Sequence, residues 1–236
     1  LFVTDTGLHA IRKVTTAGVA SFIAGRVPSG ATNGIGTAAS FNSPEGMAVD
    51  PSGNVFIADT ANHTIRKVTA DGTVTTFAGT AGTAGSSDGI NSLFRSPSGA
   101  CSDPLGNIFV ADTGNHTIRK ITPDGVVTTF AGTAGLKATT NGTGTAARFN
   151  EPRDLIMDTA GNLFVTDSKN HMIRKITPAG VVTTLAGGAA IAGSNDSTVG
   201  TLARFNTPSG IGIDSAGNLY IADRGNATIR KVTSTG

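Results

Sequence analysis

The sequence predicts an all-β protein made of repeated antiparallel units with four strands each. One 15-residue string recurs five times, beginning at Leu1, Val55, Ile108, Leu163 and Leu219. A repeat of about 55 residues indicates one structural unit copied along the chain. The apolar runs inside it are short and rich in β-branched and aromatic residues, and helical periodicity is absent.

The first two strands can be assigned in the copy at residues 41–79. Pro44 opens the first strand, which runs to Val49, because proline is tolerated at the first position of a strand. Residues 50–54, Asp-Pro-Ser-Gly-Asn, predict a hairpin turn whose glycine takes a positive φ. The second strand follows at residues 55–58.

The second half of the same copy contains two more strands. A turn at residues 59–63 leads to a third strand at 64–69, and Asp71-Gly72 forms the next hairpin. The fourth strand covers residues 73–78. Four short antiparallel strands in each repeat are typical of the blade of a β-propeller, which buries both faces against its neighbours.

The repeats make residues 1–236 a single propeller region with five blade pieces. The first piece lacks its first strand and the last piece lacks its fourth. Because both terminal pieces carry the second and third strands, they cannot merge into one blade, and we expect an incomplete arc of a six-bladed ring. Open apolar blade faces at its ends predict self-association or missing sequence. The pieces are residues 1–25, 41–79, 94–132, 149–187 and 205–236.

The string P-x-G-x-x-x-D-x-x-G-N-x-(F/Y)-(V/I)-(A/T)-D-x-x-N-H-x-I-R-K resembles the NHL repeat, and its continuation is similar to exported bacterial members. The resemblance covers essentially the whole chain, with Leu8 and Ala227 as departures in the first and last copies. It implies a propeller, most often six-bladed, that serves as a binding platform. A minority of relatives are lyases or lactonases.

Composition narrows the possible partners and the location. The formal net charge is +2, only 14% of residues are charged, and there is a single tyrosine and no tryptophan. Such a surface argues against nucleic acid as a partner. No apolar run is long enough for a membrane helix. A charge-poor surface rich in Thr, Gly and Ala, with one cysteine, leads us to expect an extracellular or periplasmic protein.

An aspartate and an arginine recur at fixed spacing in every copy. A basic ring for nucleic acid and a repeated structural ion pair are both compatible with that pattern, and identical residues in all blades favour the structural pair. The pairs are Asp5/Arg12, Asp59/Arg66, Asp112/Arg119, Asp167/Arg174 and Asp223/Arg230.

Histidines and the single cysteine are the other reactive residues. His9, His63, His116 and His171 lie one per repeat. Zinc requires three or four ligands that converge at about 2 Å, so we expect turn histidines with local hydrogen bonds and no metal or other cofactor. Cys101 has no repeat-related histidine beside it and is interpreted as a small buried residue.

The positions where the copies differ point to a ligand-binding face. Strands alternate in direction, so the turn between the second and third strands and the long loop between blades belong to one face. The loops span residues 26–40, 80–93, 133–148 and 188–204. Channel-mouth positions on this face are Glu45, Ser98, Arg153, Asp154 and Ser209, and Arg153-Asp154 is the strongest break in the repeat.

We therefore expect a non-catalytic binding or scaffold propeller whose variable loops contact a protein or a glycan, with no catalytic residue assigned. The alternative is a metal-dependent lactonase or lyase, for which the resemblance implies Ca²⁺ or Zn²⁺ on the axis. The inner strands here offer only Glu45 and Asp154 as oxygen ligands, whereas Ca²⁺ takes six to eight. Such an enzyme would therefore need ligands from further blades.

Overall fold

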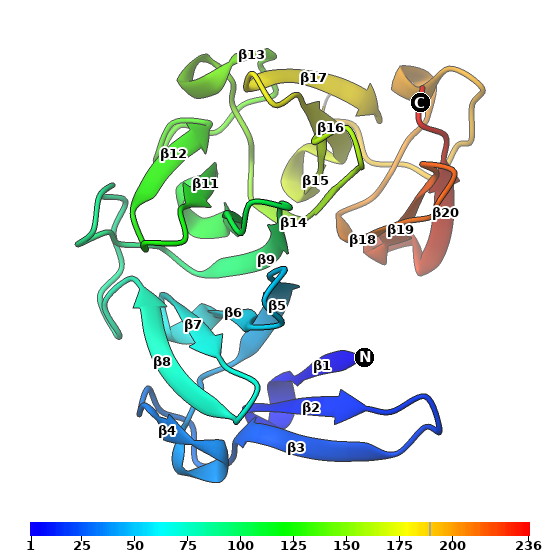
Figure 1. The fold of residues 1–236 in the computed structure, drawn as a ribbon. Coiled ribbons are helices and arrows are strands. Elements are labelled where there is room, and N and C mark those ends of the chain that lie inside the picture. The colour runs from blue at the N-terminus through cyan, green and yellow to red at the C-terminus, as the bar shows by residue number, and fades with distance from the viewer. Residues whose placement is uncertain (189) are drawn as a thin grey trace. The chain divides into compact units, whose positions relative to one another are not determined.

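The computed structural model describes residues 1–188 and 190–236, and the chain is all-β, with five antiparallel sheets and short 3₁₀ helices (Figure 1). It divides into two compact units. Unit 1 contains Leu1–Val110 and Lys120–Thr128, and unit 2 contains Ala111–Arg119 and Thr129–Gly236. Among the described residues, no helix has the length and apolarity to cross a membrane.

Unit 1 contains the first two sheets. The first has the order β1-β2-β3, and the second has the order β4-β8-β7-β6-β5. The strands of the first sheet are β1 (Phe2–Asp5), β2 (Ala10–Val14) and β3 (Ala20–Gly25). Those of the second are β4 (Gly34–Ile35), β5 (Pro44–Val49), β6 (Val55–Asp59), β7 (Thr64–Val68) and β8 (Thr73–Ala78).

The third sheet has the order β12-β11-β10-β9, the fourth β13-β17-β16-β15-β14 and the fifth β18-β19-β20. The third contains β9 (Pro97–Ser102), β10 (Ile108–Asp112), β11 (Thr117–Ile121) and β12 (Val127–Ala131). Unit 2 holds the fourth, with β13 (Gly142–Thr143), β14 (Pro152–Met157), β15 (Leu163–Asp167), β16 (Met172–Ile176) and β17 (Val181–Ala186). It also holds the fifth, with β18 (Pro208–Ile213), β19 (Leu219–Asp223) and β20 (Thr228–Val232).

The 3₁₀ helices occur at two repeated places. One follows β1, β6, β10, β15 and β19 and ends on a left-handed residue: η1 (Thr6–Leu8), η3 (Thr60–Asn62), η4 (Thr113–Asn115), η6 (Ser168–Asn170) and η8 (Arg224–Asn226). The other lies in a long loop: η2 (Gly36–Ala38), η5 (Gly144–Ala146) and η7 (Gly200–Leu202).

The structure corrects one feature of the predicted blade. The second and fourth sheets contain a fifth strand, which comes from the preceding loop. Gly34 of β4 pairs with Val74, and Gly142 of β13 pairs with Val182. The sequence shows no strand there because two residues carry no periodicity. The propeller architecture agrees with the prediction, whereas the ring of six blades is not clearly shown.

The predicted hairpins have the expected chemistry. Gly53 takes φ +82°. Asp50 Oδ1 accepts a hydrogen bond from the Asn54 backbone at 2.8 Å, and Asp50 Oδ2 accepts one from Asn54 Nδ2 at 2.8 Å. The aspartate and the asparagine therefore close each such turn from both ends.

The cores lie between successive sheets within each unit. All five residues of β6 and of β15 are buried, which fits a blade covered on both faces. In unit 1 a cluster gathers around Phe41, and in unit 2 another gathers around Phe205. Both phenylalanines begin a repeat, so each of these two repeats contributes a ring that packs against the preceding sheet.

Candidate binding face

The repeated Asp–Arg pair is a buried ion pair in the central sheets. Arg66 Nη1 lies 3.0 Å from Asp59 Oδ2, and neither side chain is exposed. Asp59 also accepts hydrogen bonds from the Asn42 backbone and from Asn62 Nδ2, both at 2.7 Å. Desolvation by burial raises the pKa of Asp59 above its ordinary value, against these hydrogen bonds and the arginine charge. Equivalent pairs join Arg119 to Asp112 at 2.8 Å and Arg174 to Asp167 at 2.9 Å.

The arginine of each pair also holds the long loop that precedes its sheet. Arg66 Nη1 donates to Ser40 O at 3.0 Å, and its Nη2 donates to Thr32 O at 3.0 Å and to Asn33 Oδ1 at 2.9 Å. One guanidinium thus binds both ends of residues 32–40. Five N–H donors in a rigid plane make arginine suited to this role.

The same clamp recurs in unit 2. Arg174 donates to Arg148 O at 3.0 Å, to Thr140 O at 3.1 Å and to Asn141 Oδ1 at 2.8 Å. Arg230 repeats the pattern on Arg204 O and Asn195 O, with Asp196 in place of the usual asparagine. The clamp therefore tolerates loops of different length and sequence.

The ion pair of the first copy is only partly buried. Arg12 contacts Asp5 through Nε at 2.8 Å, and each side chain is 27% exposed. Its guanidinium lies 4.1 Å from the ring centroid of Phe22. The same two residue types thus form a half-exposed pair in this copy.

An asparagine in the turn between the second and third strands fastens that turn to the neighbouring loops in the second, fourth and fifth sheets. Asn62 Nδ2 donates to Gly30 O at 2.7 Å, and Gly82 N donates to Asn62 O at 3.1 Å. Asn170 and Asn226 make the corresponding bonds to Ala138 O and Gly193 O, both at 2.7 Å. These turns and the long loops bonded to them are together called here the loop face; the loops also reach the turn between the third and fourth strands, where Gly36 N donates to Gly72 O at 3.0 Å.

The loop face exposes large aliphatic side chains. Every long loop has at least one that is 52–67% exposed, and Ile35 and Val199 share one position, each directly before a 3₁₀ helix. No loop contains an aromatic residue. The exposed residues are Val27, Ile35, Ile90, Leu136, Ile191, Val199 and Leu202.

The repeated histidines connect successive blades. His63 Nδ1 accepts a hydrogen bond from Ser96 N at 3.1 Å, and His171 Nδ1 accepts one from Thr207 N at 2.9 Å. His9 and His116 accept from Ser43 N and Glu151 N at 3.0 and 3.1 Å. Each of these donors has a positive φ, so the histidine satisfies a strained backbone at the start of the next blade. Spacing did not indicate this role, because the partner lies 33–36 residues away.

Replacing His171 by Ala should lower the free energy of unfolding by about 1–2 kcal/mol at pH 8, because Thr207 N loses its acceptor. Burial lowers the pKa of His171 below its usual 6.5. Only the neutral ring accepts at Nδ1, so its stabilisation is complete above pH 6.5 and declines as pH falls through the folded pKa. Urea titrations at pH 8 and pH 5 should show a smaller difference between wild type and variant at pH 5; a larger difference there would refute the assignment.

The five expected channel-mouth residues all lie on the first strand of their repeats, which is β5, β9, β14 or β18. In unit 1, Glu45 is part-buried on β5 and Ser98 is buried on β9. In unit 2, Arg153 and Asp154 lie on β14 and Ser209 lies on β18, all part-buried. Their role in binding stays a prediction.

Asp154 connects two blades of unit 2. Its Oδ2 accepts from Ile211 N on β18 at 3.1 Å, and its Oδ1 accepts from Leu155 N at 2.9 Å. Thr166 Oγ1 completes the contact, since it accepts from Asp154 N and donates to Ser209 O, both at 2.9 Å. Desolvation by burial raises the pKa of Asp154 to about 6, and no cation is among the causes of the shift.

Reverting Asp154 to the repeat residue, Gly, should change how stability depends on pH. A folded pKa of about 6, above the ordinary 3.8, means that the folded state holds a proton that the unfolded chain releases. This contribution is complete below pH 3.8 and is lost as pH rises through 6. Between pH 4 and pH 7, the free energy of unfolding should therefore fall more in wild type than in Asp154→Gly. Equal slopes in urea titrations would contradict the burial of this carboxyl group.

Two further predictions concern reactive groups. Among residues 1–188 and 190–236, no three His, Cys, Asp or Glu side chains gather as a metal site would require. Cys101 is half-buried, so the expectation of a buried residue was wrong. It lies near the end of β9, where the strand approaches a turn.

Known proteins resemble this chain over nearly its full length. Residues 41–68, 94–121 and 205–232 match the family model of the NHL repeat. NHL repeat-containing protein 2 from Bos taurus is 29% identical over 98% of this chain and 36% of its own length. An auxiliary nutrient binding protein from Bacteroides ovatus has a TM-score of 0.71 at 22% identity, over 97% of this chain and 60% of that one. Virginiamycin B lyase from Staphylococcus aureus has a TM-score of 0.64 at 17% identity, over 100% and 63%.

The two structural similarities show the fold alone, because both identities are below 25%. The chain spans about a third of the bovine relative and less than two thirds of either solved chain.

Proposed function

We propose that this chain, which is built from NHL repeats, is a non-catalytic binding propeller whose loop face contacts a macromolecular partner. The main observation behind this proposal is that constant residues of the repeat stabilise the blades and bind the loops, while the loop sequences vary. Buried Asp–Arg pairs and histidines hold the framework, while the same arginines fix loops of different sequence. A rigid scaffold that presents variable loops is the usual arrangement of a binding protein.

A protein partner fits the loop face better than a glycan. Exposed aliphatic side chains, such as Leu136 and Leu202, supply the apolar centre that protein interfaces bury. The loops contain no aromatic side chain on which a sugar ring could stack. The auxiliary nutrient binding protein of similar fold supports a binding role in general.

Photocrosslinking can test the loop face directly. A photoreactive phenylalanine at position 136 or 202 should crosslink the same protein in cells of the source organism, because both positions lie on loops of unit 2. Leu105, which is 80% exposed on the hairpin between β9 and β10, provides the control position. Mass spectrometry identifies the products; equal yields at position 105, or no product at any position, would contradict the proposal.

Charge substitutions on the loop face test the same proposal by measuring binding affinity. Leu136→Asp should weaken binding of the crosslinked protein about tenfold or more, since desolvating an aspartate opposes burial of the contact. Its effect on the free energy of unfolding should stay within about 0.5 kcal/mol, because the side chain is exposed. The matched substitution Leu105→Asp should leave affinity unchanged in a titration with the purified partner.

The second candidate is a metal-dependent lyase or lactonase. The structural similarity to virginiamycin B lyase favours it, and Asp154 is a carboxyl group with a raised pKa on an inner strand. Metal analysis of the full-length protein separates the two functions. A stoichiometric Ca²⁺ or Zn²⁺ that is lost with Asp154→Gly would support the enzyme and oppose a purely binding role.

The cellular location and the number of blades are part of the same proposal. We infer an exported bacterial protein, extracellular or periplasmic, from the charge-poor composition with a single cysteine. We also infer a six-bladed ring, from the repeat period and the number of blade pieces. Cell fractionation tests the location, and a density map of the full-length protein tests the number of blades.

A further inference from the structure

A cavity of about 320 Å³ opens in unit 1 between hairpins of two successive blades. One hairpin joins β5 to β6, and the other joins β9 to β10. Lys67 on β7 and Phe56 on β6 also line this space, called here the hairpin cavity, and Pro123 extends the wall beside the second hairpin. Its volume is near the lower end of small-molecule sites, so it suits a ligand of the size of an amino acid.

The floor of the hairpin cavity belongs to the packed core between the second and third sheets. Phe56 is 3% exposed and lies in one cluster with Ala100 and Ile108. The strand register places Phe56 opposite Lys67, so both side chains lie on the same face of the second sheet. Charged groups of a ligand therefore meet an apolar floor, where they interact more strongly than in water.

Two opposite charges line the hairpin cavity. The ammonium of Lys67 lies 5.7 Å from the ring centroid of Phe56, and within the described part of the chain it forms no ion pair. Asp50 accepts one hydrogen bond at each carboxylate oxygen, both from Asn54. A carboxylate has about four acceptor sites, so Asp50 can accept more. The cavity thus offers a cation and a carboxylate with spare acceptor sites.

The apolar rim of the hairpin cavity is not part of the constant repeat. Leu105 is 80% exposed at this rim. Three prolines line the cavity as well: Pro51, Pro104 and Pro123. Between the fourth and fifth sheets the lysine and the aspartate recur, but the equivalent rim positions carry smaller or more polar residues: Thr159, Ser215, Ala216 and Ser234. The apolar rim therefore distinguishes this pair of hairpins from the equivalent pair in unit 2.

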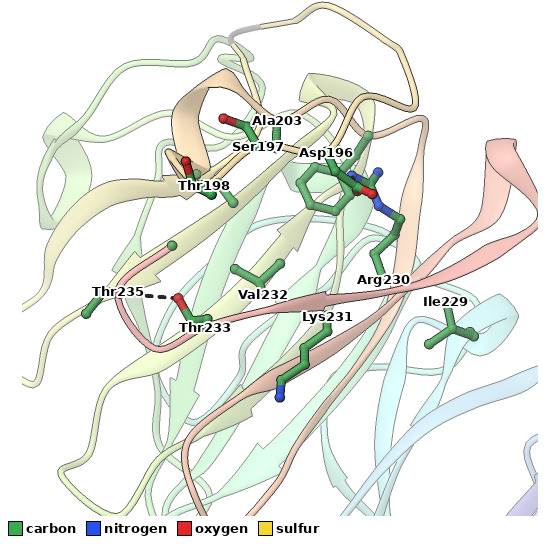
Figure 2. Close-up of a pocket in the computed structure, with 14 residues that line it drawn as sticks. Asp196, Ser197, Thr198, Ala203, Ile229, Arg230, Lys231, Val232, Thr233 and Thr235 are labelled. Atoms are coloured by element: carbon green, nitrogen blue, oxygen red, sulfur yellow. Dashed lines mark hydrogen bonds and ion pairs between the residues drawn. The ribbon is translucent and has the colours of Figure 1, made fainter.

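The larger cavity of about 570 Å³ in unit 2 differs in the state of its charges (Figure 2). Arg230, which lines it, already pairs with Asp196 and with Asp223. Figure 2 shows Asp196 directed at that guanidinium, and the hydroxyls of Thr233 and Thr235 bonded to each other. The guanidinium therefore belongs to the loop clamp and is not available to a ligand.

We propose that the hairpin cavity binds the zwitterion of an α-amino acid with an apolar side chain. The carboxylate of the ligand pairs with the ammonium of Lys67, and its α-ammonium donates to Asp50. Its side chain packs against Leu105 and the prolines of the rim, which removes apolar surface from water. A simple anion fits less well, because Asp50 repels it. This site goes beyond the proposed function, since its hairpins are not part of the loop face and its ligand is a small molecule.

Titration of the isotope-labelled chain with L-leucine tests the site by NMR. Backbone amide signals of residues 50–54 and 103–107 should shift and saturate, with a dissociation constant in the micromolar to millimolar range. Those of the equivalent hairpin at residues 158–162 should stay in place. No saturable shift at the first two hairpins, or equal shifts at all three, would overturn the proposal.

Matched variants test the two kinds of contact. Lys67→Met should weaken binding of L-leucine about tenfold or more, because the carboxylate loses its cation. Lys175→Met removes the equivalent lysine in unit 2 and should leave the affinity unchanged. Leu105→Ala should weaken binding of leucine but not of glycine. Unchanged amide signals far from the cavity verify that each variant is folded, and equal effects of the two lysine variants would refute the site.

Two analogues of leucine separate a zwitterion site from a site for any anion or apolar molecule. Isocaproate lacks the amino group, and isoamylamine lacks the carboxylate. Each should bind about tenfold or more weakly than L-leucine. Isocaproate binding as tight as that of leucine would mean that Asp50 takes no part, and it would overturn the assignment of an amino acid. Either result leaves partner binding by the loop face unaffected, since strand and hairpin residues line the cavity.

Discussion

Arg174→Met should destabilise the protein by about 3–5 kcal/mol. The substitution leaves Asp167 buried without its cation. It also leaves the carbonyl oxygens of Thr140 and Arg148 without the guanidinium that they accept from. Urea unfolding at pH 7.5 measures the loss.

The neighbouring lysine is the matched control for Arg174→Met. Lys175 lies on the same strand but is half-buried, with its amine 5.7 Å from the Phe164 ring centroid. Lys175→Met should lower the free energy of unfolding by less than about 1 kcal/mol. Equal losses for the two variants would mean that the buried ion pair has no special role.

A double variant separates the ion pair from the loop clamp. In Asp167→Leu/Arg174→Met, no buried charge remains, and replacing an ion pair by apolar groups is often neutral. The loop carbonyls still lack their donor, so we expect only partial recovery relative to Arg174→Met. Complete recovery would show that the arginine stabilises the aspartate but not the loop.

Gly46→Ala should lower the free energy of unfolding by about 2–3 kcal/mol, and by more if β9 cannot move. Gly46 lies on β5, where the next blade approaches so closely that an added Cβ would overlap Ser98 O and lie 2.6 Å from Gly99 Cα. Both contacts are backbone, so relief requires a strand shift. Thermal and urea unfolding should agree on the loss.

The fifth sheet provides the control for Gly46→Ala. A Cβ at Gly212, on β18, would meet nothing within 4 Å. Gly212→Ala should therefore be neutral or slightly stabilising, because alanine restricts the unfolded chain. A loss at position 212 as large as that at position 46 would attribute the effect to strand glycines in general.

Local structure was predictable because each repeat contains its own turn chemistry. The hairpin at Asp50–Asn54 needs only contacts between neighbours, and β8 occupies the residues expected for the fourth strand. The fifth strand was missed, since Gly34 and Ile35 gain their structure from β8 and not from their own sequence.

The interactions between blades could not be predicted from the sequence pattern. The spacing of Asp59 and Arg66 indicated a pair, but it did not show that the arginine would bind Thr32 O on a loop 34 residues away. The histidine contacts have the same character, because both partners are separated by most of a repeat. Asp154 stood out as a break in the repeat, and the structure adds its hydrogen bond to Ile211.

Hydrogen exchange in Arg174→Met tests the central claim that the repeated arginines hold the variable loops. At pH 7.5, amides of residues 133–148 should exchange markedly faster than in wild type, while those of β5–β8 in unit 1 keep their rates. The equivalent experiment with Arg66→Met should accelerate residues 26–40 instead. Unchanged loop exchange in both variants, or a uniform increase across the chain, would contradict the claim.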